Sequence, residues 1–231
     1  MQIIFWDMDG VLIDSLGLDL QVINPMLEQK YGKGTEVSRD FIRSKFALAI
    51  PEFIRDILLE VDRFNRDDWE WMVQEYEVLR RTAKFKLCPG ARDRLEEAKA
   101  LGFPQWVVSN NREADIDVIL KEAGLREFFD RVWGYDSHPQ VVKKPAPDIY
   151  LGAFESAYLE YAEASKFWVF EDSGMGIESA VSAREIWNDS PVNERDVSVE
   201  VMGVATGGDR PEDLMKASRV LDSLESFKFS L

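Results

Sequence analysis

The feature that most constrains the fold is an apolar run near the start of the chain that ends in two aspartates. Residues 3–5, Ile-Ile-Phe, have the composition of a strand buried on both faces. Asp7 and Asp9 follow this run, and Gly10 then lets the chain turn away. Carboxylates at the end of a buried strand are costly unless a cation or a reaction partner compensates them. The segment therefore indicates a metal site and carboxylate chemistry.

Further short apolar runs predict a parallel sheet. Helical patterns at 91–101, at 113–123 and after Gly174 lie between these runs. Strands that alternate with helices are typical of an α/β fold whose parallel sheet is covered on both faces. The predicted strands are Gln2–Trp6, 105–109, 131–134, 167–170 and 199–204.

One interval interrupts this alternation. Residues 16–85 contain no strand pattern, but apolar stripes at helical spacing run through 16–27, 53–61 and 69–79. The Pro-Gly pair at 89–90 then marks the return to the α/β pattern. We therefore expect a helical domain at 16–85, inserted into an α/β core formed by 1–15 and 86–231.

Charge and composition exclude several classes of partner. The formal charge of −15 and the pI near 4.6 disfavour nucleic acid and anionic membranes. Cys88 is the single cysteine, which excludes an intramolecular disulfide. No apolar run approaches the ~18 residues of a membrane span, and the N-terminus lacks the basic region of a signal peptide. We expect a cytoplasmic protein and favour a monomer.

Polar residues gather where the predicted strands end. Carboxyl ends of parallel strands lie at one edge of the sheet, where open α/β sheets bind their ligands. Four segments in the order of the chain therefore converge on one predicted site. They are Asp7 with Asp9, Ser109 with Asn110, Lys144 before a Pro-x-Pro-Asp sequence, and Glu171 with Asp172.

The order and spacing of these segments resemble the haloacid dehalogenase superfamily. Members have a Rossmann-like three-layer core, and the inserted helical domain is similar to the C1-type cap of phosphoglycolate phosphatases and β-phosphoglucomutases. The resemblance implies a Mg²⁺-dependent phosphatase that hydrolyses a small-molecule phosphate ester through an aspartyl-phosphate. The second aspartate, Asp9, favours phosphate esters as substrates, because family members that cleave carbon–halogen or phosphonate bonds have no acid at this position.

The same resemblance implies a role for each catalytic position. Asp7 is expected to be the nucleophile, and Asp9 the general acid that later activates water. Lys144 would neutralise charge on the nucleophile and the phosphoryl group. Ser109 and the backbone amide of Asn110 would hold the phosphoryl oxygens.

The resemblance also implies a metal site. Asp7, the carbonyl of Asp9, and Asp172, helped by Glu171, would bind Mg²⁺. Physical chemistry supports a cation, because two like charges about 4 Å apart repel by about 4 kcal/mol at an effective dielectric constant near 20. Oxygen ligands suit Mg²⁺ better than zinc, which favours histidine or cysteine.

Two alternative functions differ from that of a phosphatase. A sugar-phosphate mutase of the β-phosphoglucomutase type would carry a histidine in its first cap helix, but the stretch around Asp19 has none. Such enzymes also carry a glycine and an arginine in the cap loop, and the loop at 46–52 has neither, which favours hydrolysis. The same loop is mostly apolar and offers few hydrogen-bond donors, so we expect a small or partly apolar leaving group. The second alternative is a non-catalytic binding protein on the same scaffold, since a fold does not establish an activity.

Overall fold

The computed structural model describes residues 1–45, 48–82, 84–139 and 141–229. It divides into two compact units, the first formed by Met1–Ile13 with Leu87–Leu231 and the second by Asp14–Lys86. Within the described ranges, no helix combines the length and apolar character that a membrane crossing requires.

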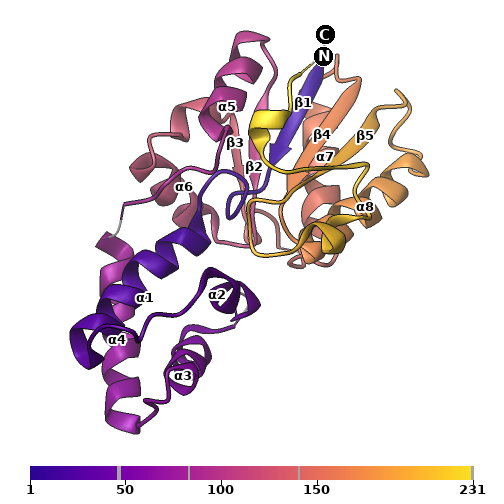
Figure 1. Ribbon diagram of the computed structural model, residues 1–231. Helices are drawn as coiled ribbons and strands as arrows, with labels where there is room; N and C mark the ends of the chain where they lie inside the picture. The colour runs from indigo at the N-terminus through magenta and orange to yellow at the C-terminus, as the bar shows by residue number, and fades with distance from the viewer. Residues whose placement is uncertain (46–47, 83, 140, 230–231) are drawn as a thin grey trace. The chain divides into compact units, whose positions relative to one another are not determined.

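The first unit is built on a parallel sheet, as the sequence predicts. The strand order is β3-β2-β1-β4-β5-β6 in the described part of the chain, and every neighbouring pair is parallel. The first strand along the chain thus lies in the interior of the sheet, between β2 and β4 (Figure 1). The strands are β1 Gln2–Trp6, β2 Gln105–Val108, β3 Arg131–Trp133, β4 Lys166–Glu171, β5 Ser198–Val204 and β6 Arg219–Leu221.

One face of the sheet is covered by α7 (Asp148–Glu160) and α8 (Gly174–Asn188). Phe5 lies at the centre of this layer, because successive side chains of a strand point to opposite faces. Its ring contacts those of Phe154 at 5.2 Å, Phe167 at 5.3 Å and Trp106 at 5.7 Å between centroids. These edge-on contacts anchor β1 between its neighbours.

The next residue of β1 faces the other layer. Trp6 stacks on Phe170 at 4.4 Å and meets Phe229 edge-on at 6.3 Å. Its indole donates to Gln105, whose amide donates in turn to the carbonyl of Leu95 in α5 (Ala91–Ala100). Further short elements are α6 (Glu113–Glu122) and the 3-10 turns Arg126–Phe128, Pro211–Leu214 and Leu224–Ser226.

The sequence did not predict every element. Strand β6, which has three residues, was missed, although β3 of the same length was predicted. Helix α7 was missed because Leu159 adds an apolar residue on its exposed side and Gly152 weakens the helical signal. Strands β2 and β3 end one residue before their predicted ends, which is within the usual uncertainty of such boundaries.

The second unit is helical. Its helices pack their apolar stripes into a separate core that includes Ile23, Ile57 and Met72. Asp14 caps the first helix by accepting from the Gly17 amide at 2.9 Å. Positions 46 and 47 of the loop considered above lie outside the described residues. The helices are α1 Ser15–Tyr31, α2 Arg39–Lys45, α3 Ile50–Glu60 and α4 Arg66–Thr82.

The aromatic layer under β1 can be tested on helix α7. We expect Phe154→Ala to lower the free energy of unfolding by about 3–5 kcal/mol, because the ring is fully buried and leaves a cavity. Leu159→Ala on the same helix is the control; this side chain is 80% exposed, so the expected change is within about 0.5 kcal/mol. Urea unfolding measures both, and equal losses would show that α7 does not pack as described.

Candidate functional site

The polar residues predicted at the strand ends do come together. Asp7 follows β1, Ser109 follows β2, Glu171 ends β4 and Asp172 follows it, and these three strands are neighbours in the sheet. Lys144 reaches the same place from the segment between β3 and α7. All five side chains are buried, although four of them are ionisable.

The buried ammonium of Lys144 connects three strands. Its Nζ donates to Asp7 Oδ1 at 2.6 Å, to Glu171 Oε1 at 2.6 Å and to the carbonyl of Val108 at 2.8 Å. These bonds use all three ammonium hydrogens. Burial opposes the charged form, but the carboxylates of Asp7 and Glu171 outweigh it and raise the pKa of Lys144 above its ordinary value. Lys144 therefore remains charged.

The side chain of Asn110 fixes the backbone that carries this lysine. Its Oδ1 accepts from the Lys144 amide at 2.8 Å, and its Nδ2 donates to the Lys144 carbonyl at 3.2 Å. The two bonds form a closed pair between the end of β2 and the lysine segment. Asn110 thus has a structural contact that its predicted backbone role did not include.

Asp172 lies against backbone that leaves no room for side chains. A Cβ added to Gly10 would lie 2.0 Å from Asp172 Oδ2, and one added to Gly207 would lie 1.5 Å from it. The same oxygen accepts from the Gly208 amide at 3.2 Å. The loop after β5 is therefore part of the site, and the Asp172 carboxylate requires glycine at position 207.

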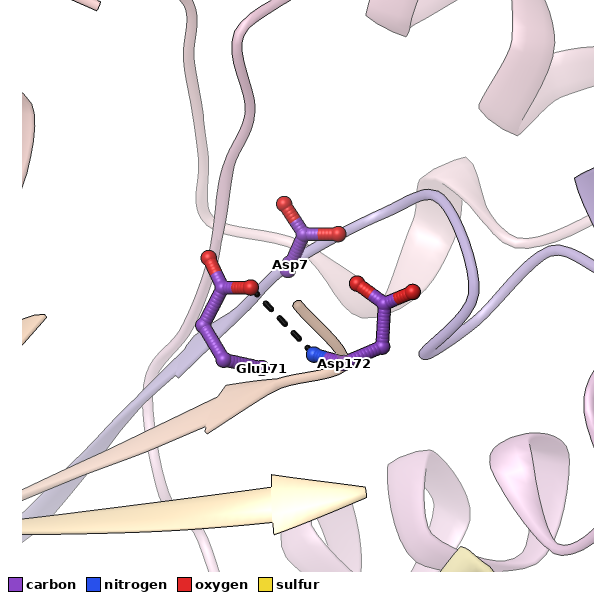
Figure 2. Close-up of side chains that lie close together, drawn as sticks. All are labelled: Asp7, Glu171 and Asp172. Atoms are coloured by element: carbon purple, nitrogen blue, oxygen red, sulfur yellow. Dashed lines mark hydrogen bonds between the residues drawn. The ribbon is translucent and has the colours of Figure 1, made fainter. Parts of the chain in front are cut away.

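Glu171 has both of its oxygens engaged in hydrogen bonds. Oε1 accepts from Lys144 and, at 2.7 Å, from the hydroxyl of Tyr150 in α7. Oε2 accepts from the backbone amide of Asp172 at 3.2 Å (Figure 2). These contacts orient Glu171 toward the lysine.

The acidic side chains fit a divalent cation. Asp7, Glu171 and Asp172 each place a carboxylate oxygen within 4.8 Å of the others (Figure 2). Three carboxylates against the one ammonium of Lys144 leave a formal charge of −2 in a buried place, which a divalent ion would neutralise. The donors are all oxygens, as Mg²⁺ and Ca²⁺ require.

Asp9 is held beside Ser109 by a residue that the sequence did not single out. Asn111 Nδ2 donates to Asp9 Oδ2 at 2.8 Å and to Ser109 Oγ at 3.2 Å. Asp9 is also less buried than Asp7 and Asp172. The structure therefore places every predicted site residue at the same edge of the sheet.

Sequence reasoning missed three residues of this site, for different reasons. Asn111 directly follows a recognised segment, so its position was a usable signal. Gly207 belongs to a Gly-Gly pair after a predicted strand, which also hinted at close approach of the backbone. Tyr150 gave no signal, because a tyrosine in a helix is most simply a core residue.

The repulsion within the acidic cluster predicts the effect of Asp172→Asn. Burial, followed by the charges of Asp7 and Glu171, raises the pKa of Asp172 well above its ordinary value. The unfolded chain loses this proton near the usual pKa of about 4, so stability falls as the pH rises between the two pKa values. We therefore expect Asp172→Asn to stabilise the metal-free protein at neutral pH, and this gain to vanish below about pH 4.

Urea unfolding in EDTA at the two pH values measures this effect. Asp115→Asn, on the exposed face of α6, is the matched control and should change little. Adding a divalent cation in excess should stabilise the wild type more than Asp172→Asn, because only the folded site binds it. If Asp172→Asn in EDTA were less stable than the wild type at neutral pH, this result would contradict the proposed repulsion.

Comparison with known proteins identifies relatives of this chain. A phosphorylated carbohydrates phosphatase from Thermotoga maritima is 30% identical over 190 residues, which cover 79% of this chain and 82% of the relative. Protein CbbY from Rhodobacter capsulatus is 31% identical over 115 residues, 48% of each chain. The chain thus spans about half the length of this relative, and less of two other curated relatives.

Solved structures share the fold. A HAD family hydrolase from Deinococcus radiodurans R1, solved with bound phosphate and sodium, matches with a TM-score of 0.72 at 20% identity, over 96% of this chain and 91% of that one. A family model for haloacid dehalogenase-like hydrolases matches residues 1–184. The chain belongs to the haloacid dehalogenase-like hydrolase family.

Proposed function

We propose that the chain is a Mg²⁺-dependent phosphatase that hydrolyses a small-molecule phosphomonoester through an aspartyl-phosphate on Asp7. The observation that carries this proposal is the contact between Lys144 Nζ and Asp7 Oδ1 at 2.6 Å, beside the carboxylate of Asp172. A buried carboxylate held by a fixed ammonium is a positioned nucleophile. The phosphatase named among the relatives supports the same chemistry.

In the first step, an oxygen of Asp7 attacks phosphorus and the bond to the ester oxygen breaks. Asp9 gives its proton to the departing alkoxide, so that an alcohol leaves. Lys144 offsets negative charge on the nucleophile and on the phosphoryl oxygens, and Ser109 donates its hydroxyl hydrogen to one of those oxygens.

In the second step, Asp9 takes a proton from water, and the water oxygen attacks phosphorus. The bond between phosphorus and Asp7 breaks, which releases inorganic phosphate and restores the carboxylate of Asp7 and the protonated carboxyl group of Asp9. One group thus serves as acid and then as base, as the reversal of charge on Asp9 requires.

We assign the metal to Asp7, Asp172 and the Asp9 carbonyl. Bound Mg²⁺ would supply positive charge to the phosphoryl group in this otherwise acidic protein. Glu171 was also predicted as a ligand, but its oxygens are already engaged; we propose that it acts by holding Lys144. We further propose that the helical unit is the cap of this family, which selects the substrate.

The roles of the two aspartates predict different defects. Asp7→Asn should lower turnover of an aryl phosphate by about 10³-fold or more, because it removes the nucleophile. Asp9→Asn should still become phosphorylated by the aryl ester, whose phenolate leaves unprotonated, and should then accumulate the phosphoenzyme. Steady-state rates and intact-protein mass spectrometry distinguish the two, with Asp115→Asn as an active control. Substantial turnover by Asp7→Asn would refute the nucleophile.

A panel of phosphate esters separates this function from the alternatives. After EDTA treatment and readdition of Mg²⁺, we expect inorganic phosphate in equal amount to the alcohol, with small esters preferred over polyanionic sugars. A mutase would convert one sugar phosphate into another without releasing equivalent phosphate. A binding protein would show no turnover, although beryllofluoride with Mg²⁺ would still raise its melting temperature.

A further inference from the structure

We infer that Asn111 is a positioning residue that holds Asp9 and Ser109 in their working orientations. The inference rests on the proposed function, because it concerns the acid that protonates the leaving group. Its structural basis is the pair of bonds from Asn111 Nδ2, at 2.8 Å to Asp9 Oδ2 and at 3.2 Å to Ser109 Oγ. An amide nitrogen has two hydrogens, and these two bonds use both.

The backbone of Asn111 is itself fixed. Its carbonyl accepts from the Tyr135 amide at 3.2 Å, and its amide donates to Ser109 Oγ at 3.2 Å. The loop after β3 can lie this close to Asn111 because residue 134 is a glycine. A Cβ at that position would lie 2.7 Å from the Asn111 carbonyl oxygen. The side-chain amide therefore projects from an anchored segment rather than from a free loop.

The bond to Asp9 can persist in both protonation states of the carboxyl group. Asn111 can only donate through Nδ2, so Asp9 Oδ2 remains an acceptor whether the carboxyl is protonated or ionised. The same bond serves the acid step and the base step, and no rearrangement is needed between them.

The bonds from Asn111 also constrain the hydroxyl group of Ser109. A serine hydroxyl has two acceptor positions and one hydrogen, and Asn111 occupies both acceptor positions through its backbone and side-chain nitrogens. The hydroxyl hydrogen must then be donated elsewhere, and no described residue is recorded as its acceptor. Ser109 is left to donate to a phosphoryl oxygen.

The test compares two esters that differ in their need for an acid. We expect Asn111→Ala and Asn111→Asp to lower kcat/KM for ethyl phosphate by about 10- to 100-fold, the effect of losing a hydrogen bond to a charged group. For p-nitrophenyl phosphate, whose leaving group needs no proton, the expected loss is about threefold or less, because only the bond to Ser109 matters. Because kcat/KM covers the steps up to phosphorylation, the later role of Asp9 does not obscure the comparison.

Asn111→Asp keeps the shape of the side chain but removes the donor, so it remains informative where the alanine variant fails to fold. Asn188→Ala makes the same substitution at the exposed end of α8, far along the chain from the site segment, and serves as the control. It should behave as wild type. Equal losses on both esters would overturn the inference. Wild-type activity of Asn111→Asp would also overturn it, because that side chain would then only fill space.

A second readout does not depend on activity. Crystal structures of wild type and Asn111→Ala should show the Asp9 carboxylate leaving its position when the amide is absent, and an unchanged Asp9 would overturn the inference. Failure of the wild type to hydrolyse either ester would instead refute the proposed function, and the position of Asp9 in the two structures would still decide the role of Asn111.

Discussion

The site depends on one buried ammonium. Lys144 contacts the carboxylate after β1, the carbonyl that ends β2 and the carboxylate that ends β4. Neighbouring strands of a parallel sheet bring these acceptors together, but they also bring negative charges together in a largely buried place. Without the lysine, the uncompensated carboxylates would oppose folding. The ammonium therefore makes the acidic strand ends compatible with a packed sheet.

The remaining negative charge explains the rest of the site. The lysine neutralises one of three carboxylates, and the formal charge of −2 that is left matches a divalent cation. Asp172 has no such ammonium in the described residues and is instead surrounded by glycine backbone from two loops. The protein as a whole is strongly acidic, so attraction of an anionic ester requires positive charge concentrated at this edge.

Most of the fold was predicted from local patterns in the sequence. The run that becomes β1 is apolar on both faces and ends in aspartates, and the interval that becomes the helical unit shows only helical spacing. An evenly apolar element, such as α7, lacked a period that could be recognised. Most of the predicted site residues were found because they lie at or just beyond the end of a strand, where the sequence itself marks the end of the apolar run. Lys144, which comes from the segment between β3 and α7, was instead found from the Pro-x-Pro-Asp sequence that follows it.

The sequence by itself determined the family, the parallel sheet and the set of ionisable groups at its edge, since these follow from residue type and from spacing along the chain. Only the tertiary structure decided which atoms meet: Asn111 with Asp9, Tyr150 with Glu171, and Gly207 with Asp172. The physical reason is that each of these contacts joins segments from 21 to 102 residues apart in the chain. Their geometry depends on strand order and loop path, which local patterns do not encode.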